Sequence, residues 1–145
     1  MDDFSPLSVW LKRIETQLND SQKRRLTQRI STKLKQSMAR RIKSQVSPSG
    51  ARFVPRKHDH KRSIRRGAMF QRLPKLIKNV YSSTHAEVGF AGHTATVMEV
   101  HQFGKVAKPS PNARAIAYPV RETVGFSPED EQLIIKEIEN FFNAL

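Results

Sequence analysis

The sequence predicts an α+β fold that combines basic N-terminal helices, a small antiparallel sheet and a C-terminal amphipathic helix. Apolar residues recur at helical spacing in residues 6–46 and again in residues 128–145. Short segments rich in β-branched and aromatic residues lie between these two regions. A chain of 145 residues fits one domain, 1–145, in which 1–47 form a helical region and 48–66 a basic loop.

Two helices are expected before residue 48. The first begins with Ser5 as its cap and Pro6 at its first position, and it ends near Asn19. Its apolar face consists of Leu7, Trp10, Leu11, Ile14 and Leu18, with Trp10 expected in the core. Asp20 is suited to cap the second helix, and the turn residues 47–50 end it. The apolar stripe of this second helix consists of Leu26, Ile30, Leu34, Met38, Ile42 and Val46.

The stripe of the second helix has a four-residue spacing, whereas an α-helix has about 3.6 residues per turn, so the stripe winds slowly around the helix. Such a stripe suits packing against a partner helix, or against another subunit, that crosses at an angle. We therefore take Leu26, Ile30, Leu34 and Met38 as candidate interface residues.

The middle of the chain predicts short elements. A short helix is expected at 64–73, with a break near Pro74, and strands are expected at 76–81 and 87–90. Periodicity does not separate strand from helix in 94–103, but the following Gly104 favours a helix that it caps. An exposed loop at 105–117 and a last strand at 118–124 complete this region.

The final helix carries the strongest local signals. Ser127 is suited to cap it, Pro128 fits its first position, and three acidic residues follow in its first turn. Its buried face is expected to consist of Leu133, Ile134, Ile138, Phe141, Phe142 and Leu145.

The charge of the chain is concentrated in its middle. The formal net charge is +13, and Ser21–Val80 carries 19 Lys and Arg against Asp59 alone. Such a block indicates contact with a polyanion or an acidic protein surface, or else a solvated face, without deciding between them. The candidate contact residues are Arg40, Arg41, Lys43, Arg52, Arg56, Lys57, Lys61, Arg62, Arg65 and Arg66.

The motifs of common enzymes are missing from the sequence. There is no cysteine, no P-loop and no G-x-S-x-G element, and Glu99 and His101 are more simply an ion pair than a catalytic pair. His58-Asp59-His60 lies among basic residues that oppose a metal cation. We therefore expect no enzyme activity, no cofactor and no metal. A membrane span and a secretory leader are not expected either.

Several segments resemble the phage virion morphogenesis family, the tail completion proteins of P2-like and Mu-like contractile-tailed phages. The segments that carry the resemblance are RIKSQVSPSG (41–50), RFVPR (52–56), MFQRL (69–73), VGF (88–90), VHQFG (100–104) and YPVRETVGFSPED (118–130). The resemblance covers most of the chain after about residue 20. In the segment 100–104 we expect a turn in which Phe103 is buried and Gly104 has a positive φ.

The resemblance implies a non-enzymatic virion protein that acts where the tail joins the DNA-filled head. It implies a ring of copies, commonly six, with tail tube, sheath and head-connector proteins as partners and packaged DNA nearby. It places the protein in the host cytoplasm during assembly and afterwards in the neck of the particle. His101, Phe103 and Arg121 become candidate interface residues, and the basic block would face DNA or an acidic connector. The alternative function is a nucleic-acid-binding accessory protein that uses residues 21–80.

Overall fold

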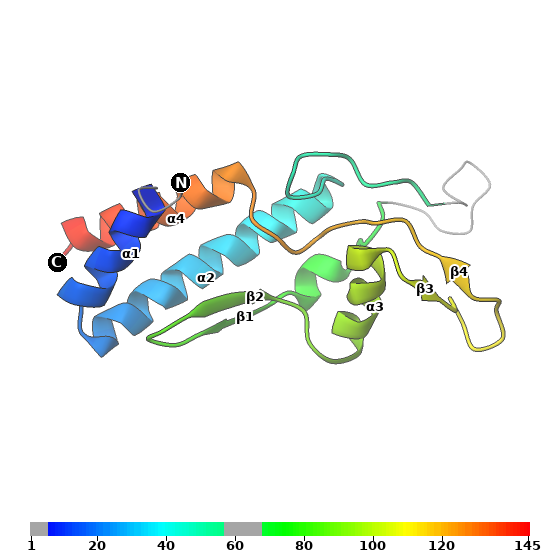
Figure 1. Cartoon of the computed structure of the whole chain (residues 1–145), viewed down its shortest axis with the longest axis horizontal. Coiled ribbons are helices and arrows are strands. Elements are labelled where there is room, and N and C mark those ends of the chain that lie inside the picture. The colour runs from blue at the N-terminus through cyan, green and yellow to red at the C-terminus, as the bar shows by residue number, and fades with distance from the viewer. Residues whose placement is uncertain (1–5, 57–67) are drawn as a thin grey trace. The chain divides into compact units, whose positions relative to one another are not determined.

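A computed structural model describes residues 6–56 and 68–145, which form two compact units. The first unit consists of Met1–Ser37, Asn79–Val88 and Phe126–Leu145, and the second of Met38–Lys78 and Gly89–Gly125. The described residues contain four α-helices and two two-stranded sheets, so the predicted α+β class is confirmed. Figure 1 gives the order of these elements along the chain.

The first unit is built around three helices, which are α1 (Pro6–Gln17), the larger part of α2 (Asp20–Lys43) and α4 (Pro128–Asn143). Helices α1 and α4 lie against each other (Figure 1). The core consists of Leu18, Leu26, Ile134, Ile138 and Phe141, with Leu7, Trp10, Ile14, Ile30, Leu34 and Phe142 packed against it. The ring of Trp10 lies 5.7 Å from that of Phe142, as expected for a core residue. The stripe of α2 therefore finds a helical partner within its own chain.

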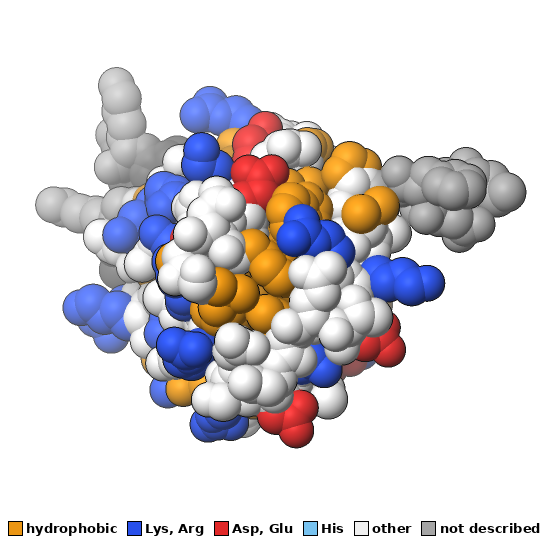
Figure 2. Space-filling model, turned by 90° about the vertical axis from the view of Figure 1, so that its left-hand side faces the viewer, with side chains coloured by type: hydrophobic (Ala, Val, Ile, Leu, Met, Phe, Trp, Pro, Cys, Tyr) orange, Lys and Arg blue, Asp and Glu red, His pale blue; other side chains and the backbone are white. Residues whose placement is uncertain are grey.

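Hydrophobic side chains also reach the surface of the first unit. Val9 and Leu11 on α1 are 55% and 53% exposed, and Leu145 is 62% exposed. The predictions that Leu11 and Leu145 lie on buried faces were therefore wrong. Leu145 follows the end of α4, so it no longer shares the face of that helix. Figure 2 shows hydrophobic side chains gathered near the middle of one face, with Lys and Arg around them.

Both ends of α2 differ from the prediction. At its start, Asn19 and not Asp20 makes the cap, because Asn19 Oδ1 accepts from the amide of Gln22 and Gln22 Oε1 accepts from the amide of Asn19. At its end, the helix stops at Lys43 and Gln45 adopts a φ of 61°. Val46 therefore lies outside the helix, where it forms an isolated β-bridge with Arg52.

The start of α4 confirms the predicted cap. Ser127 Oγ accepts from the amide of Asp130 at 3.1 Å, and Asp130 Oδ2 accepts from the amide of Ser127 at 3.0 Å. Asp130 is 1% exposed, and Ser37 donates a hydrogen bond to its other oxygen. Ile134, Ile138 and Phe141 are buried as expected. Leu133 and Phe142 are half-buried, and Ile135 and Glu137 are also buried although the prediction did not include them.

The two strands predicted at 76–81 and 87–90 form a hairpin, β1 (Lys78–Tyr81) with β2 (Ala86–Gly89). Its residues in the first unit are fixed to α2 by two side-chain hydrogen bonds. Thr27 Oγ1 donates to the carbonyl of Ser82 at 2.6 Å, and Asn79 donates to Ser31 Oγ at 3.1 Å. Figure 1 shows the hairpin running beside α2.

The second unit contains a 3-10 helix (Leu73–Leu76), α3 (Gly92–Phe103) and the strands β3 (Val106–Ala107) and β4 (Ile116–Ala117). Its buried hydrophobic residues are Met38, Ile42, Phe53, Met69, Leu73, Ile77 and Met98. The predicted helix before Gly104 is confirmed as α3, and Gly104 caps it with a φ of 65°.

Three predictions for the second unit were wrong or untested. Residues 105–117 are not a loop throughout, because β3 and β4 pair as an antiparallel hairpin. Pro74 lies in the first turn of the 3-10 helix instead of breaking a preceding helix, and residues 68–72 form turns. Residues 64–67 of the predicted short helix, and 57–66 of the basic loop, lie outside the described residues.

Candidate functional site

Arg121 and His101 bring the family-like segments 100–104 and 118–130 together in the second unit. Arg121 is only 6% exposed. Its Nε donates to the carbonyl of Val54 at 2.7 Å, and a terminal nitrogen donates to the carbonyl of Pro55 at 3.1 Å. The other terminal nitrogen lies 3.3 Å from His101 Nδ1. Arg121 therefore joins three separate segments through neutral acceptors.

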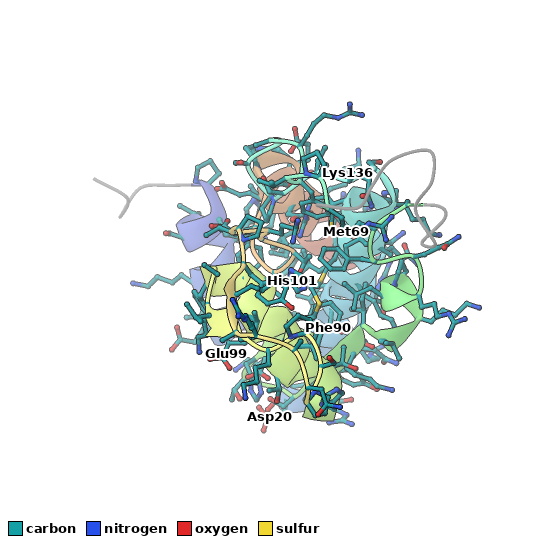
Figure 3. The ribbon with its side chains drawn as sticks, turned by 90° about the vertical axis from the view of Figure 1, so that its right-hand side faces the viewer. Asp20, Met69, Phe90, Glu99, His101 and Lys136 are labelled. Atoms are coloured by element: carbon teal, nitrogen blue, oxygen red, sulfur yellow. The ribbon has the colours of Figure 1, made fainter. Side chains whose placement is uncertain are left out.

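These contacts define the protonation state of His101. Arginine can only donate, so Nδ1 accepts the hydrogen bond and the proton of the neutral ring lies on Nε2. Burial, followed by the charge of Arg121, lowers the pKa of His101 below its ordinary value of 6.5. The ring packs edge-on against Phe70 at 4.9 Å and Tyr118 at 5.2 Å. Figure 3 labels His101 on α3.

The side chain of Gln102 makes hydrogen bonds with the backbone of the segment 118–124, as the backbone of a neighbouring strand would do in a sheet. Its Oε1 accepts from the amides of Thr123 and Val124 at 3.0 and 3.1 Å, and its Nε2 donates to the carbonyl of Val124 at 2.9 Å. The amide of Arg121 bonds to the carbonyl of His101 at 2.7 Å. The strand predicted at 118–124 is therefore wrong, because this backbone bonds to a helix end and a side chain and not to a strand ladder.

Gly104 lets the segment at Val120 come close to the end of α3. A Cβ atom at Gly104 would lie 2.8 Å from Val120 Cγ2 and 3.1 Å from the carbonyl oxygen of Tyr118. The predicted positive φ of Gly104 is confirmed. The predicted burial of Phe103 was wrong, because its side chain is 65% exposed. Val106 and Val120 are 68% and 53% exposed, and we call these three residues the apolar surface.

The second unit carries all of the net positive charge. It holds 17 of the 26 Lys and Arg residues but only 3 of the 13 Asp and Glu residues, so its formal charge is +14. The first unit has the remaining 9 basic and 10 acidic residues, a formal charge of −1.

The candidate contact residues have different surroundings. Arg40, Lys43 and Arg52 are exposed. Arg41 donates to the carbonyls of Thr123 and Gly125 at 3.3 and 3.0 Å, and Arg56 is half-buried. The other predicted members, Lys57, Lys61, Arg62, Arg65 and Arg66, lie outside the described residues.

Within the first unit, several basic residues of α2 contact the protein itself. Arg24 lies over the ring of Tyr81 at 5.0 Å, and Arg25 lies over Phe141 at 5.7 Å. Arg29 and Lys33 lie 3.5 and 3.9 Å from the carboxylate of Glu137, whose side chain is 9% exposed. These contacts give the basic residues of this part of α2 a structural use.

The candidate interface residues on α2 are already in contact with their own units. Leu26 and Met38 are 0% and 3% exposed, while Ile30 and Leu34 are half-buried against the core of the first unit. Their contact with another subunit stays a prediction. Of the other candidates, Phe103 presents most of its side chain to the surface, whereas His101 and Arg121 mainly hold the segments in place.

In residues 6–56 and 68–145, no group of three His, Asp or Glu side chains is arranged to hold a metal. His58-Asp59-His60 lies outside them. The carboxylate of Glu99 lies 2.8 Å from Lys105 Nζ, so this lysine is its ion-pair partner in place of the predicted His101. None of the described helices has the length and apolar character of a membrane span.

Sequence reasoning missed Gln102, Val106 and Val120. Gln102 lies inside the segment that carried the resemblance, so its position was a signal although its bonds were not. Val106 lies in the segment predicted as a loop and Val120 in the segment predicted as a strand, and neither pattern indicated that these side chains are exposed. Their importance comes from their exposure beside Phe103 and Gly104.

Comparison of the sequence with known proteins agrees with the family resemblance of its segments. A family model described as the phage virion morphogenesis family matches residues 2–143. Because the match covers nearly the whole chain, the protein belongs to the phage virion morphogenesis family. It is similar to the tail completion protein S of Escherichia phage P2, with 29% identity over 140 residues that span 92% of this chain and 93% of that protein. No solved structure matches the chain. The family resemblance is thus confirmed, and the protein has a role in phage tail assembly.

Proposed function

We propose that the protein completes the head-proximal end of a contractile tail and makes that end competent to join the head. The observation that supports this step is the apolar surface of Phe103, Val106 and Val120. Phe103 and Val106 lie on either side of Gly104 in the sequence, and Val120 Cγ2 lies close to Gly104, so these three exposed side chains are candidates for a site of protein contact. Phe103 and Gly104 belong to the segment 100–104, so the same local structure that fixes the fold also presents the contact.

The same proposal includes assembly of several copies into a ring, commonly of six. A heterologous interface joins two different surfaces of one subunit and closes into a ring when the rotation allows it. The exposed Leu11 on α1 provides a second contact point, which would meet the apolar surface of the next copy. In this role the protein is a non-enzymatic component of the virion neck, with tail tube, sheath and head-connector proteins as its partners.

Electron microscopy of particles that carry Phe103→Ser tests the proposal. Because Phe103 is 65% exposed, the variant should keep the unfolding midpoint of the wild type, yet tails should accumulate without heads. Val97→Ser on the same helix is the matched control, since Val97 is also exposed but lies outside the apolar surface. Normal head-tail joining in the Phe103 variant, or in particles that lack the protein, would contradict the proposal.

A second candidate function, contact with DNA, is favoured by the charge of +14 on the second unit. The basic residues of α2 in the first unit contact Tyr81, Phe141 and Glu137, so the nucleic-acid hypothesis narrows from residues 21–80 to the second unit. Its most accessible described candidates on α2 and after it are Arg40, Lys43 and Arg52.

Salt-dependent titration of duplex DNA tests this second candidate. Each phosphate contact contributes about −0.9 to the slope of log K against log salt concentration. Replacing Arg40, Lys43 and Arg52 together by Gln should flatten the slope, whereas replacing Arg24, Arg25 and Arg29 by Gln should leave it nearly unchanged. Equal effects of the two triple variants, or binding without salt dependence, would exclude the assignment.

A further inference from the structure

The second unit contains a cavity of about 510 Å³ at the meeting of its two family-like segments. We call it the motif pocket, and its lining residues are Arg56, Met69, Phe70, His101, Pro109, Ile116, Ala117, Tyr118, Pro119 and Arg121. Its volume is typical of a ligand site, as is an apolar wall with a few polar groups. Among the described residues, no Asp or Glu belongs to this lining, whereas two arginines do.

The charge of Arg121 has no carboxylate partner among the described residues. Its three hydrogen bonds go to the carbonyls of Val54 and Pro55 and to His101, all of which are neutral acceptors. A guanidinium group has five N–H donors, so two remain for a further acceptor. A nearly buried cation with neutral partners is stabilised strongly when an anion reaches it. The pocket therefore favours a carboxylate.

The geometry also limits where such a carboxylate can come from. Arg121 is 6% exposed, so the stiff backbone of duplex DNA cannot approach it closely, whereas one side chain of a peptide can enter. Apart from Arg56 and Arg121, the lining is apolar or aromatic. Phe53, Phe70, His101 and Tyr118 form a continuous series of ring contacts. An aliphatic neighbour of the acidic residue would find complementary contacts on these walls.

We propose that the motif pocket binds an acidic side chain of a partner protein, presented next to an aliphatic residue. This inference rests on the proposed function, in which the protein joins others in the virion, and it specifies the chemistry of one partner. Arg121 would supply the remaining N–H donors, while Ile116, Tyr118 and Pro119 would contact the aliphatic neighbour.

Titration of the full chain with short peptides, followed by NMR, tests the proposal without particle assembly. The probe is N-acetyl-leucyl-glutamic acid amide, and the control is its glutamine analogue. We expect shifts of the Arg121 Nε–H signal and of the amides of Tyr118, Val120 and Arg121, with at least tenfold tighter binding of the glutamate peptide. Ile116→Glu should abolish this binding because it places a negative charge in the wall, whereas Val106→Glu on the paired strand should retain it.

Three results would overturn the proposal. Equal or absent binding of the two peptides would show that the carboxylate is not recognised. Inorganic phosphate that binds as tightly as the glutamate peptide would indicate a general anion site. Tighter peptide binding by Asp59→Asn would mean that an acid of the chain itself occupies the pocket. The proposed function and the pocket can be tested separately with Val106→Glu. If this variant binds the glutamate peptide but does not support head-tail joining, the apolar surface and the motif pocket act independently.

Discussion

Arg121 Nε donates a 2.7 Å hydrogen bond to the backbone carbonyl of Val54, a residue 67 positions earlier in the chain. This bond, with those to Pro55 and His101, fixes the segment around residue 54 to the segment around residue 121. The planar guanidinium group serves three acceptors at once, and an ammonium group cannot reproduce that geometry. Arg121 is therefore first a structural residue, and its free N–H groups are available for binding.

Replacement of Arg121 by lysine should destabilise the protein by about 2–3 kcal/mol, because the carbonyls of Val54 and Pro55 lose charged donors. Arg114→Lys is the control, since Arg114 is exposed and no such bonds depend on it. Urea unfolding of both variants measures the difference. A loss within about 0.5 kcal/mol of the control, which is typical of a surface substitution, would contradict the structural role.

The side chain of Gln102 can be tested by two substitutions. Gln102→Ala removes all three hydrogen bonds to Thr123 and Val124 and should destabilise the protein by about 2–3 kcal/mol. Gln102→Glu keeps both accepted bonds but loses the donor to Val124, so its effect should be smaller. Hydrogen exchange should show the amides of Thr123 and Val124 protected in the wild type and in Gln102→Glu, but not in Gln102→Ala. Unchanged protection in the alanine variant would refute this arrangement.

At Gly104, an added side chain would meet both an unfavourable positive φ and a close neighbour, Val120. A substitution at Gly50 would meet only the unfavourable φ, so the two positions separate backbone strain from steric clash. Gly50 has a φ of 90° but nothing within 4 Å of an added Cβ atom, so Gly50→Ala should cost about 1 kcal/mol of backbone strain. Gly104→Ala adds a clash with Val120 and should cost about 3 kcal/mol in total. Thermal unfolding compares them. Equal losses would show that Val120 moves aside without penalty.

His101 predicts a dependence of stability on pH. Its pKa is below 6.5 in the folded protein, chiefly because of burial and secondly because of Arg121. As the pH falls below 6.5, the unfolded chain binds a proton before the folded chain does, so the free energy of unfolding decreases until the folded value is passed. Urea midpoints at pH 7.5 and 5.5 should show this loss, and His101→Gln should remove part of it. His93→Gln, at an exposed histidine of the same helix, is the matched control substitution, and an equal change of slope in both variants would contradict the role of His101.

The elements that could be predicted from the sequence are those with local causes. Ser127, Pro128 and Asp130 determine the start of α4 within four residues, and Gly104 determines the end of α3. The prediction of a strand at 118–124 failed because its hydrogen-bond partner is the side chain of Gln102, about 20 residues earlier. No sequence pattern of the strand itself contains that information.

Only part of the candidate site could be predicted, again because contacts between distant segments are not visible in the local sequence. The family-like segments led to His101, Phe103 and Arg121, but whether a side chain is buried depends on tertiary packing. Phe103 was therefore placed inside although it is exposed. Likewise, the charge block of 21–80 was visible in the sequence, but the contacts of Arg24 with Tyr81 and Arg25 with Phe141 appear only after folding.

The path of the chain through its two units affects how recombination would change the protein. The chain passes from one unit to the other after Ser37, Lys78, Val88 and Gly125, four times in all. Each unit is therefore made of separated stretches, and the first unit includes both ends of the chain, so no shorter contiguous fragment contains it complete. A gene crossover at any position within the chain would therefore mix residues of the first unit from two parents, and a crossover between residues 38 and 125 would mix those of the second unit as well. Phages that exchange pieces of their genomes would consequently preserve this protein best by exchanging it whole.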